Sequence, residues 1–251
     1  MNDIHIVTGA SSGVGRALCK HLATRGLNVL GVARRGTELE QLKDEHPNEI
    51  QTINVDLARP SAWQSVADRV RGQHQVSTLT HSAAISTKGH LKDISLESYR
   101  AMMAINVDAP FFLTQALLPH FRRGARVLHL SSGAAHHVRE YSGMYSITKA
   151  ALLMIYRAWN ADFPNREIVV GSTSPGTVDG PMQDRARSGD YPGVERYRAY
   201  KEKGMLIQPS RVAEYLAWLL FGTSDEEFAS QDWSITDKSH HARWLKGSLT
   251  G

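Results

Sequence analysis

The stretch IHIVTGASSGVG, residues 4–15, decides the predicted fold. Its apolar start, Ile4–Val7, indicates a short strand, and a helical pattern follows the glycine-rich turn and ends near Gly26. A dinucleotide-binding loop requires this order of strand, glycine turn and helix, because the glycines admit a pyrophosphate and the helix start offers unpaired N–H groups. A plain tight turn between strand and helix is the alternative. We expect the turn to contact a cofactor through Gly9, Ser11, Ser12, Gly13, Val14 and Gly15.

The second predicted strand, Val29–Ala33, ends at Arg34. In a dinucleotide fold this strand end meets the adenosine ribose, where an acidic residue suits the 2′-OH of NAD and arginine suits the 2′-phosphate of NADP. Arg34 therefore predicts NADP(H). Arg16, just past the glycine turn, is a second candidate phosphate contact, with a solvated helix residue as the alternative.

Asp56 and Leu57 follow the third predicted strand, Gln51–Val55. An aspartate at this strand end can accept a hydrogen bond from an adenine amino group, and the leucine can pack on the base. The alternative for Asp56 is capping of the helix predicted over Pro60–Val70.

The stretch SSGAAHHVREYSGMYSITK, residues 131–149, carries the predicted chemistry. Tyr145 and Lys149 are four residues apart and so lie on one face of a helix. Ser132 stands 13 residues before Tyr145, at the end of an apolar strand-like run. A free phenol has a pKa of about 10, which a nearby ammonium is expected to lower. The serine hydroxyl can hold a substrate carbonyl against the tyrosine, so the three residues predict a proton-transfer site, although Tyr-x-x-x-Lys alone occurs often as an ordinary exposed pair.

The remaining pattern alternates strands with helices, which predicts one domain over residues 1–251 with a doubly wound parallel sheet and helices on both faces. A long helix is expected from Leu96 to Phe121, kinked at Pro110, with Asn106 either structural or holding a water. The polar segment 179–204 is a candidate substrate lid, and residues 238–251 form a basic tail.

Size and composition set outer limits on the function. The chain has 251 residues, a net charge of +4 and one cysteine, Cys19. We expect no disulfide framework, no signal peptide and no membrane span, and therefore a cytoplasmic protein. Its basic residues are too scattered to predict a nucleic-acid site. The histidine pairs at 136–137 and 240–241 lack a third ligand at metal-binding spacing, so we expect no metal, although the first pair could line a substrate mouth.

Over nearly its whole length the chain resembles the short-chain dehydrogenase/reductase family. The resemblance rests on TGASSGVG, Asp56, Asn106, Ser132, Tyr145, Lys149 and the turn Pro175-Gly176, in the family's order and spacing. It implies that Tyr145 is the catalytic acid or base, that Ser132 orients the carbonyl, and that Lys149 binds the nicotinamide ribose. It also implies a relay water at Asn106 and cofactor contacts at Ala83, Pro175, Gly176 and Val178.

The chain departs from the family pattern after the fourth predicted strand, Val76–Thr80. His81-Ser82-Ala83-Ala84 stands where Asn-Asn-Ala-Gly is usual, which could weaken cofactor binding. The last third resembles sepiapterin reductase and related benzil reductases, which implies a substrate contact at Asp237. A surface cap is the alternative for that residue.

The sequence therefore predicts an NADPH-dependent reductase of a small ketone or vicinal dicarbonyl, benzil-like or sepiapterin-like. A non-catalytic NADP-binding or sensing protein is one alternative, and an NAD-dependent alcohol dehydrogenase is another. The helix after Tyr145 is apolar on more than one face, and the resemblance implies a homodimer or homotetramer.

Overall fold

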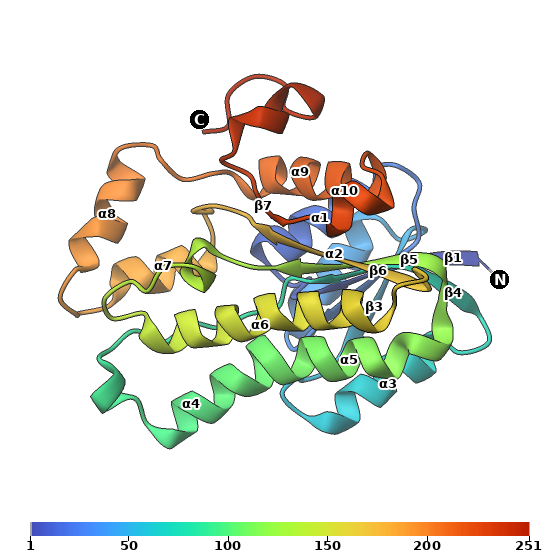
Figure 1. Ribbon diagram of the computed structural model, residues 1–251, viewed down its shortest axis with the longest axis horizontal. Coiled ribbons are helices and arrows are strands. Elements are labelled where there is room, and N and C mark those ends of the chain that lie inside the picture. Colours follow the sequence, from blue (N-terminus) through green and yellow to red (C-terminus); the bar gives the residue numbers. More distant parts are fainter. Residues whose placement is uncertain (1, 251) are drawn as a thin grey trace.

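A seven-stranded parallel sheet forms the centre of the computed structural model, which describes residues 2–250 (Figure 1). The strand order is β3-β2-β1-β4-β5-β6-β7, so the direction of winding reverses between β1 and β4, and ligands of such sheets bind outside the carboxyl ends near that point. The predicted doubly wound α/β fold is confirmed. The strands are β1 (Asn2–Thr8), β2 (Val29–Ala33), β3 (Ile50–Asn54), β4 (His74–His81), β5 (Phe121–Leu130), β6 (Ile168–Ser174) and β7 (Asp232–Ser234).

Helices cover both faces of the sheet (Figure 1). One layer contains α1 (Gly13–Ala23), α2 (Gly36–Glu45), α9 (Pro209–Phe221) and α10 (Asp225–Ala229). The other contains α3 (Pro60–Val70), α4 (Leu96–Met103), α5 (Ala109–Leu117) and α6 (Gly143–Asp162). Successive strand residues face opposite layers: Val7 packs with Leu18 and Leu216, whereas Ile6 packs with Val66 and Leu113. The strands therefore supply two cores, and each core needs its own helix layer.

The predicted helix from Leu96 to Phe121 is wrong at its end. α4 passes through a π-helical turn, η2 (Ala104–Asp108), into α5, and a 3₁₀ turn, η3 (Leu118–His120), follows. Phe121 already belongs to β5. Pro119, which has no N–H to continue the helical hydrogen bonds, lies in the 3₁₀ turn that ends the helix. Pro110 sits in the first turn of α5 directly after the π-turn, where proline is tolerated.

The helical stretch Leu96–His120 is long and apolar enough to cross a membrane if length and composition alone are considered. Core helices of soluble proteins pass the same test. Here α5 packs against α3, β4 and β5, so its buried apolar side chains belong to a core, whereas Leu96, Tyr99 and Phe112 are exposed.

The segment predicted as a lid folds into two short helices, α7 (Pro181–Ser188) and α8 (Val194–Glu202). Its base is closed by a parallel bridge between Val178 and Ile207. The Asp179 N–H donates to the Ile207 carbonyl oxygen at 2.9 Å, and the Ile207 N–H donates to Thr177 at 2.8 Å. The lid therefore leaves the sheet and returns to it at one point beside the carboxyl end of β6.

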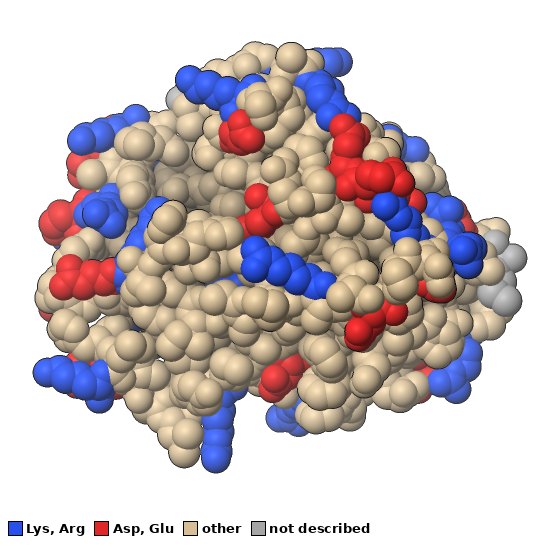
Figure 2. All heavy atoms as spheres, in the orientation of Figure 1, with Lys and Arg blue, Asp and Glu red and all other residues tan. Residues whose placement is uncertain are grey.

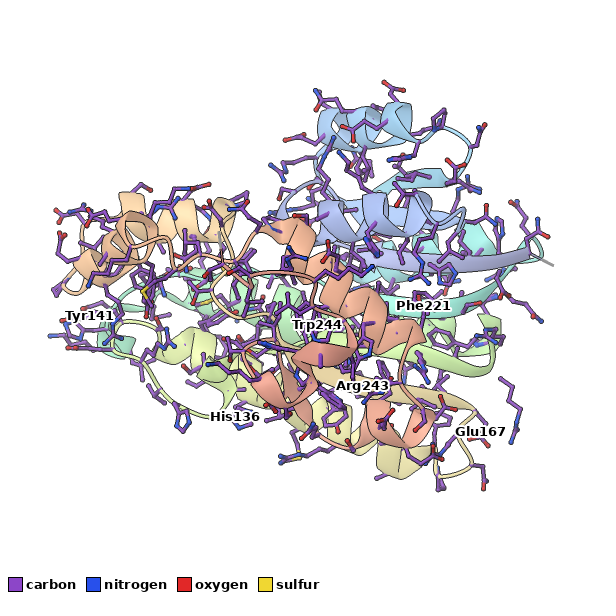
Figure 3. The ribbon with its side chains drawn as sticks, turned by 90° about the horizontal axis from the view of Figure 1, so that it is seen from above. His136, Tyr141, Glu167, Phe221, Arg243 and Trp244 are labelled. Carbon is purple, nitrogen blue, oxygen red and sulfur yellow. The ribbon has the colours of Figure 1, made fainter. Side chains whose placement is uncertain are left out.

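The C-terminal segment folds back over α9 through the 3₁₀ turn η5 (Lys238–Arg243) (Figure 3). The ring of His240 stacks on those of Tyr215 and Trp218, and the Trp244 indole N–H donates to its Nδ1 at 2.9 Å. This aromatic cluster holds the predicted tail against the α9 layer.

Candidate functional site

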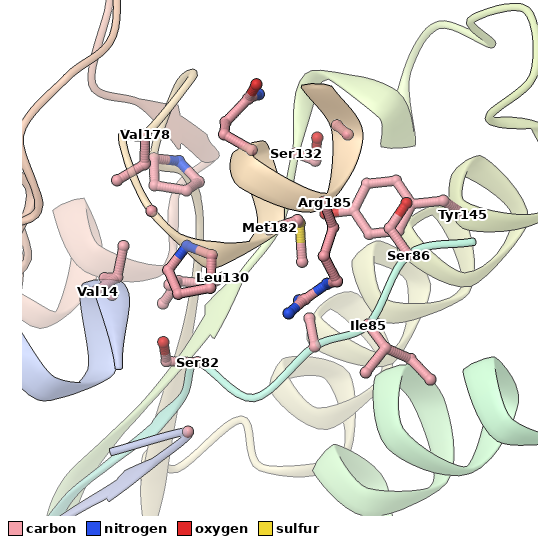
Figure 4. Close-up of a pocket in the computed structure, with 18 of the residues that line it drawn as sticks. Val14, Ser82, Ile85, Ser86, Leu130, Ser132, Tyr145, Val178, Met182 and Arg185 are labelled. Atoms are coloured by element: carbon pink, nitrogen blue, oxygen red, sulfur yellow. The ribbon is translucent and has the colours of Figure 1, made fainter. Parts of the chain in front are cut away.

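A cavity of about 940 Å³ opens at the carboxyl ends of the strands, between the glycine turn and the lid (Figure 4). Its walls come from the turn after β1, from the segments that follow β2, β4, β5 and β6, and from α7 and α8. These segments are distant in the sequence but converge because parallel strands end at one edge of the sheet. The cavity is therefore the candidate active site.

The glycine turn forms one wall and leaves the start of α1 facing the cavity. Ser12 is the N-cap of α1, and its side chain makes no cap hydrogen bond within residues 2–250. Backbone N–H groups at a helix start, with the partial positive charge of the helix dipole, suit a phosphate. A Cβ on Gly9 would lie 2.9 Å from the Ala83 nitrogen, and one on Gly15 would lie 2.5 Å from the Gly9 oxygen. The turn can pack this closely only with glycine at these two positions, so the wall fits a dinucleotide pyrophosphate.

Two arginines follow β2 and line the same cavity: Arg34, the predicted one, and Arg35. The Arg35 guanidinium donates from Nε and Nη2 to the Ser11 hydroxyl at 3.2 and 3.0 Å. Arg34 is mostly exposed, with Nε 3.9 Å from an Asp56 carboxylate oxygen. Arg35 also pairs with Glu38, with Nη1 3.1 Å from a carboxylate oxygen. The two guanidinium groups stand where the 2′-phosphate of NADP would bind in this fold, each with a carboxylate close by. Arg35 was not predicted as a cofactor contact, although it directly follows Arg34 and carries the same charge.

The side chain of Arg16 does not lie with these two arginines. Its guanidinium donates to the Glu38 carbonyl oxygen at 2.7 Å and to the Glu45 carboxylate at 2.8 Å, which ties α1 to α2. It is not among the described residues that line the cavity. A helix position just past the turn could not reveal which way so long a side chain points.

The predicted adenine wall is formed in part. Leu57 and Ala83 line the cavity, whereas the side chain of Asp56 does not. One Asp56 oxygen accepts a hydrogen bond from the Ala58 N–H at 3.2 Å. Helix α3 has Arg59 at its N-cap, so Asp56 orders the loop before the helix rather than capping it.

Ser132, Tyr145 and Lys149 line the opposite wall. Figure 4 shows the first two. Ser132 follows β5, and Tyr145 lies in the first turn of α6, close enough for the serine hydroxyl to act on the pKa of the phenol. The Lys149 Nζ lies 5.6 Å from the centre of the Tyr145 ring and donates to the Leu130 carbonyl oxygen at 2.6 Å. The predicted spacing therefore places a hydroxyl, a phenol and an ammonium at one site.

The electrostatics of this wall differ from the prediction. Burial raises the pKa of Tyr145 to about 12, and the hydrogen bond with Ser132 opposes that rise. Burial lowers the pKa of Lys149 to about 8, and the carboxylate of Asp232 opposes that fall. The expected lowering of the phenol pKa by Lys149 is thus not found, because the ammonium is itself desolvated and bonds a backbone carbonyl. Tyr145 is a protonated phenol at neutral pH.

A family model described as short chain dehydrogenase matches residues 3–190. The chain belongs to the short-chain dehydrogenase family. This dehydrogenase is therefore an oxidoreductase that acts on CH–OH or C=O groups and has the fold of nicotinamide-dependent enzymes.

Relatives of this dehydrogenase include reductases. It is 29% identical over 196 residues to the NADPH-dependent 3-dehydrocapnine reductase of Ornithobacterium rhinotracheale, covering 74% of this chain and 69% of that protein. It is 31% identical over 208 residues to the L-xylo-3-hexulose reductase of Hypocrea jecorina, covering 72% and 68%. The crystal structure of a short chain dehydrogenase from Burkholderia cenocepacia J2315 in complex with NADP shares the fold, with a TM-score of 0.78 and 24% identity over 93% of this chain and 95% of that one.

Asn106 is buried in the π-turn η2, outside the cavity lining of this dehydrogenase. Its side-chain oxygen accepts from the Ile85 N–H at 2.9 Å, and both amide hydrogens are bonded, to the Ile85 carbonyl and to Thr148. The side chain thus clamps the segment after β4 onto α6. The family's relay water at this residue stays a prediction.

The turn after β6 lies where the resemblance implies: Pro175, Gly176 and Val178 all line the cavity. Asp237, in contrast, caps the 3₁₀ turn η5 by accepting from the Ser239 N–H at 2.9 Å, and it is not among the described residues that line the cavity. His136 also turns away, with its Nε2 2.7 Å from the Asp232 carboxylate. Among residues 2–250, no group of three or more potential metal ligands is found.

Proposed function

We propose that this dehydrogenase reduces the carbonyl group of a small ketone or vicinal dicarbonyl with NADPH. One observation carries the proposal: a cavity has a dinucleotide wall on one side and the hydroxyl, phenol and ammonium of Ser132, Tyr145 and Lys149 on the other. The cofactor and the substrate carbonyl can therefore bind in the same cavity.

The choice of NADPH rests on Arg34 and Arg35. A carboxylate after β2 would favour NAD, whereas here two guanidinium groups border the cavity. The names of two relatives agree, since one is an NADPH-dependent reductase and another was crystallised with NADP. NADPH would be held by the glycine turn, by these arginines, and by the wall that Leu57 and Ala83 provide.

Bound NADPH would supply the hydride that reduces the carbonyl carbon. The Ser132 hydroxyl donates a hydrogen bond to the carbonyl oxygen and holds it against Tyr145. The phenol then gives its proton to that oxygen, which completes the alcohol. Lys149, positioned by the Leu130 carbonyl, offers a positive charge beside the phenolate that remains and a route for its reprotonation.

The high pKa of Tyr145 favours reduction over oxidation. A protonated phenol is ready to act as an acid, whereas alcohol oxidation needs a base and therefore a phenolate. The alternative of an NAD-dependent alcohol dehydrogenase is opposed by the two arginines after β2, where NAD would call for a carboxylate. The unusual His81–Ala84 segment also leaves the cavity open, because Ser82, Ala83 and Ala84 line it rather than fill it, which removes the main argument for a non-catalytic sensor.

Within this class, the benzil-like substrate is better supported than the sepiapterin-like one. The predicted pterin contact, Asp237, bonds Ser239 outside the cavity lining. The wall contributed by Ile85, Met182 and Tyr145 is mostly apolar and suits an aryl or alkyl group (Figure 4).

The test is NADPH oxidation with benzil and with sepiapterin, wild type against Tyr145→Phe. We expect turnover of the dicarbonyl and a loss of roughly 10²- to 10⁴-fold in kcat for the variant, because general acid catalysis contributes about that much. NADPH affinity, measured by cofactor fluorescence, serves as the control for folding and should be retained. An unchanged rate in Tyr145→Phe would refute the mechanism.

A further inference from the structure

Three cationic side chains border the cavity on the side of Tyr145 and the lid, beyond the dinucleotide wall. They are Lys88 after β4, Arg139 before α6, and Arg185 on α7. Among the described residues that line the cavity, Asp190 is the one acidic residue. This part of the wall thus carries a net positive charge that the proposed catalytic chemistry does not use.

Lys88 is held at a fixed place close to Tyr145. Its Nζ donates to the Ser142 hydroxyl at 2.7 Å and to the Tyr197 hydroxyl at 2.8 Å, and it lies 4.6 Å from the centre of the Tyr197 ring. Ser142 is the N-cap of α6, three residues before Tyr145. Tyr197, which accepts from Lys88, is in turn close enough to Tyr145 to raise the pKa of its phenol. The ammonium is therefore held beside the start of the helix that carries Tyr145, and both side chains line one cavity.

The partners of Lys88 are neutral, which leaves its charge uncompensated. An ammonium has three hydrogens, and hydroxyls accept two of them here. Within residues 2–250, no carboxylate lies within ion-pair distance of Lys88. A partly buried charge of this kind is normally paired, so the missing partner is expected from a ligand.

Arg139 and Arg185 repeat this pattern from two other elements. Neither guanidinium has a carboxylate partner in the part of the chain that the structure describes. Two other lid arginines are paired: Arg187 with Asp184, and Arg198 with Glu195 at 2.6 Å. Figure 4 shows Arg185 reaching from α7 into the pocket beside Ile85 and Met182.

Tyr197 reports the positive potential of this region. Burial alone would raise the pKa of its phenol. Hydrogen bonds with Lys88 and Ser142, together with the charges of Lys88 and Arg139, instead lower that pKa below its usual value. The space between these side chains therefore stabilises negative charge.

We propose that the substrate of this dehydrogenase carries an anionic group, a carboxylate, phosphate or sulfonate, which binds Lys88, Arg139 and Arg185 while the substrate carbonyl meets Ser132 and Tyr145. This inference rests on the proposed reductase function. It adds that the ketone and the anion belong to one small molecule, because the three cations line the same cavity as Ser132 and Tyr145.

The first experiment compares matched acids and esters with NADPH and wild-type protein. The pairs are 4-oxo-4-phenylbutanoate with its methyl ester, and phenylglyoxylate with its methyl ester. We expect kcat/KM for at least one acid to exceed that of its ester by roughly tenfold or more, the effect of one charge-assisted hydrogen bond. Turnover of the esters at equal or higher efficiency would overturn the anion site and leave the reductase function standing. Absence of turnover with benzil, acids and esters alike would instead overturn the proposed function.

The second experiment assigns the effect to side chains. Lys88→Met, Arg139→Gln and Arg185→Gln should each raise KM for the preferred acid roughly tenfold and leave KM for its ester and the Kd of NADPH within about twofold. Lys88→Arg should restore much of the loss, and Arg198→Gln is the matched lid control. Equal losses for acid and ester in Lys88→Met would mean that Lys88 only supports Ser142 and Tyr197. If Arg185→Gln binds NADPH more weakly and keeps the ratio of KM for acid and ester, Arg185 contacts the cofactor and not the substrate anion.

A binding measurement without turnover completes the test. Benzenesulfonate, phenyl phosphate and benzoate are titrated calorimetrically into the NADPH complex, with benzamide as the neutral control, and the three anions separate the possible headgroups. At least one anion should bind more tightly than benzamide in wild type and lose that advantage in Lys88→Met/Arg139→Gln. Equal binding of all four compounds would contradict the proposal.

Discussion

The Lys149 ammonium is 3% exposed and bonds the Leu130 carbonyl, so burial disfavours its charged form. The nearby carboxylate that supports that charge belongs to Asp232, which is held by Ser131, Ser172 and His136. Asp232 touches neither the phenol nor the serine of the proposed site and acts through Lys149. It is therefore a positioning residue. It could not be selected from the sequence, because β7 and α6 are brought together only by the fold.

Asp232→Asn should shift the pH profile of the enzyme. The proposed role of Lys149 needs its charged form, so kcat/KM for NADPH should fall as pH rises through about 8. The carboxylate raises the pKa of Lys149, and its removal should lower that pKa and move the alkaline limb to lower pH. His136→Gln keeps the carboxylate and should leave the midpoint in place. A midpoint that moves upward in Asp232→Asn, or does not move, would contradict the role given to Asp232.

Arg34→Gln and Arg35→Gln should each reduce the preference for NADPH over NADH. A charge-assisted hydrogen bond to the 2′-phosphate is worth about 1.5–3 kcal/mol, or roughly 10- to 100-fold in the ratio of the two Kd values. Fluorescence titration with both cofactors measures that ratio. Arg71→Gln, a surface arginine paired with Asp68, is the control. Unchanged ratios in both variants would remove the argument for NADP.

At the scale of elements, the glycine turn joins β1 to α1 by close backbone contact with the segment after β4. Thr8 strengthens this contact, because its hydroxyl accepts from the N–H groups of Ser82 and Ala83 at 3.0 and 3.1 Å. Gly9 has φ of +71°, where a side chain is strained in any case. The unusual His81–Ala84 segment is therefore held by the same atoms that shape the dinucleotide wall.

Gly9→Ala should destabilise the protein more than Gly26→Ala. Both glycines have positive φ, but a Cβ on Gly9 meets backbone atoms at 2.9 Å, whereas a Cβ on Gly26 has no described atom within 4 Å. Strain at positive φ costs roughly 1–3 kcal/mol in either variant, and the clash adds to it only at Gly9. Thermal unfolding should show a Tm for Gly9→Ala at least about 2 °C below that of Gly26→Ala, together with weaker NADPH binding. Equal losses would mean that the turn can move aside.

At the scale of the whole molecule, the outer face of the α5–α6 layer exposes apolar side chains. Ile147 and Met154 are 47% and 58% exposed on α6, seven residues apart on one side of the helix, and Phe112 on α5 is 39% exposed. Figure 2 shows charged residues of both signs scattered over the face that it presents, with a hollow beside the lid helices. An exposed apolar stripe on two neighbouring helices fits contact with a second copy.

We therefore expect a dimer or tetramer, with a mass by light scattering that is a multiple of 27.8 kDa. Met154→Glu should shift the population toward the monomer, because it places a charge within the proposed contact. Lys43→Glu, on α2 in the other helix layer, introduces the same charge away from this face and serves as the control. A single 27.8 kDa species for the wild type would exclude this assembly.

Much of the fold could be predicted, because the period of apolar residues and the glycine turn are local signals. The pairing of Tyr145 with Lys149 was equally local. The direction of exposed side chains could not be predicted. Arg16, Asp56 and Asp237 have the expected chain positions, but their side chains do not line the cavity. The wall of Lys88, Arg139 and Arg185 also escaped prediction, since Lys88 meets Ser142 and Tyr197 across 54 and 109 residues of chain. Only the folded sheet edge brings these groups together.

The central claim is that the cavity joins a reduced nicotinamide to a substrate carbonyl next to Tyr145. The most direct measurement follows deuterium from NADPH labelled at C4, on either face separately, into the alcohol formed from benzil or from 4-oxo-4-phenylbutanoate, by mass spectrometry. The account predicts deuterium on the carbinol carbon from one of the two labelled cofactors, and its loss together with turnover in Tyr145→Phe. Unlabelled alcohol from both labelled cofactors would contradict the account. Alcohol formed at an equal rate by Tyr145→Phe would contradict it as well.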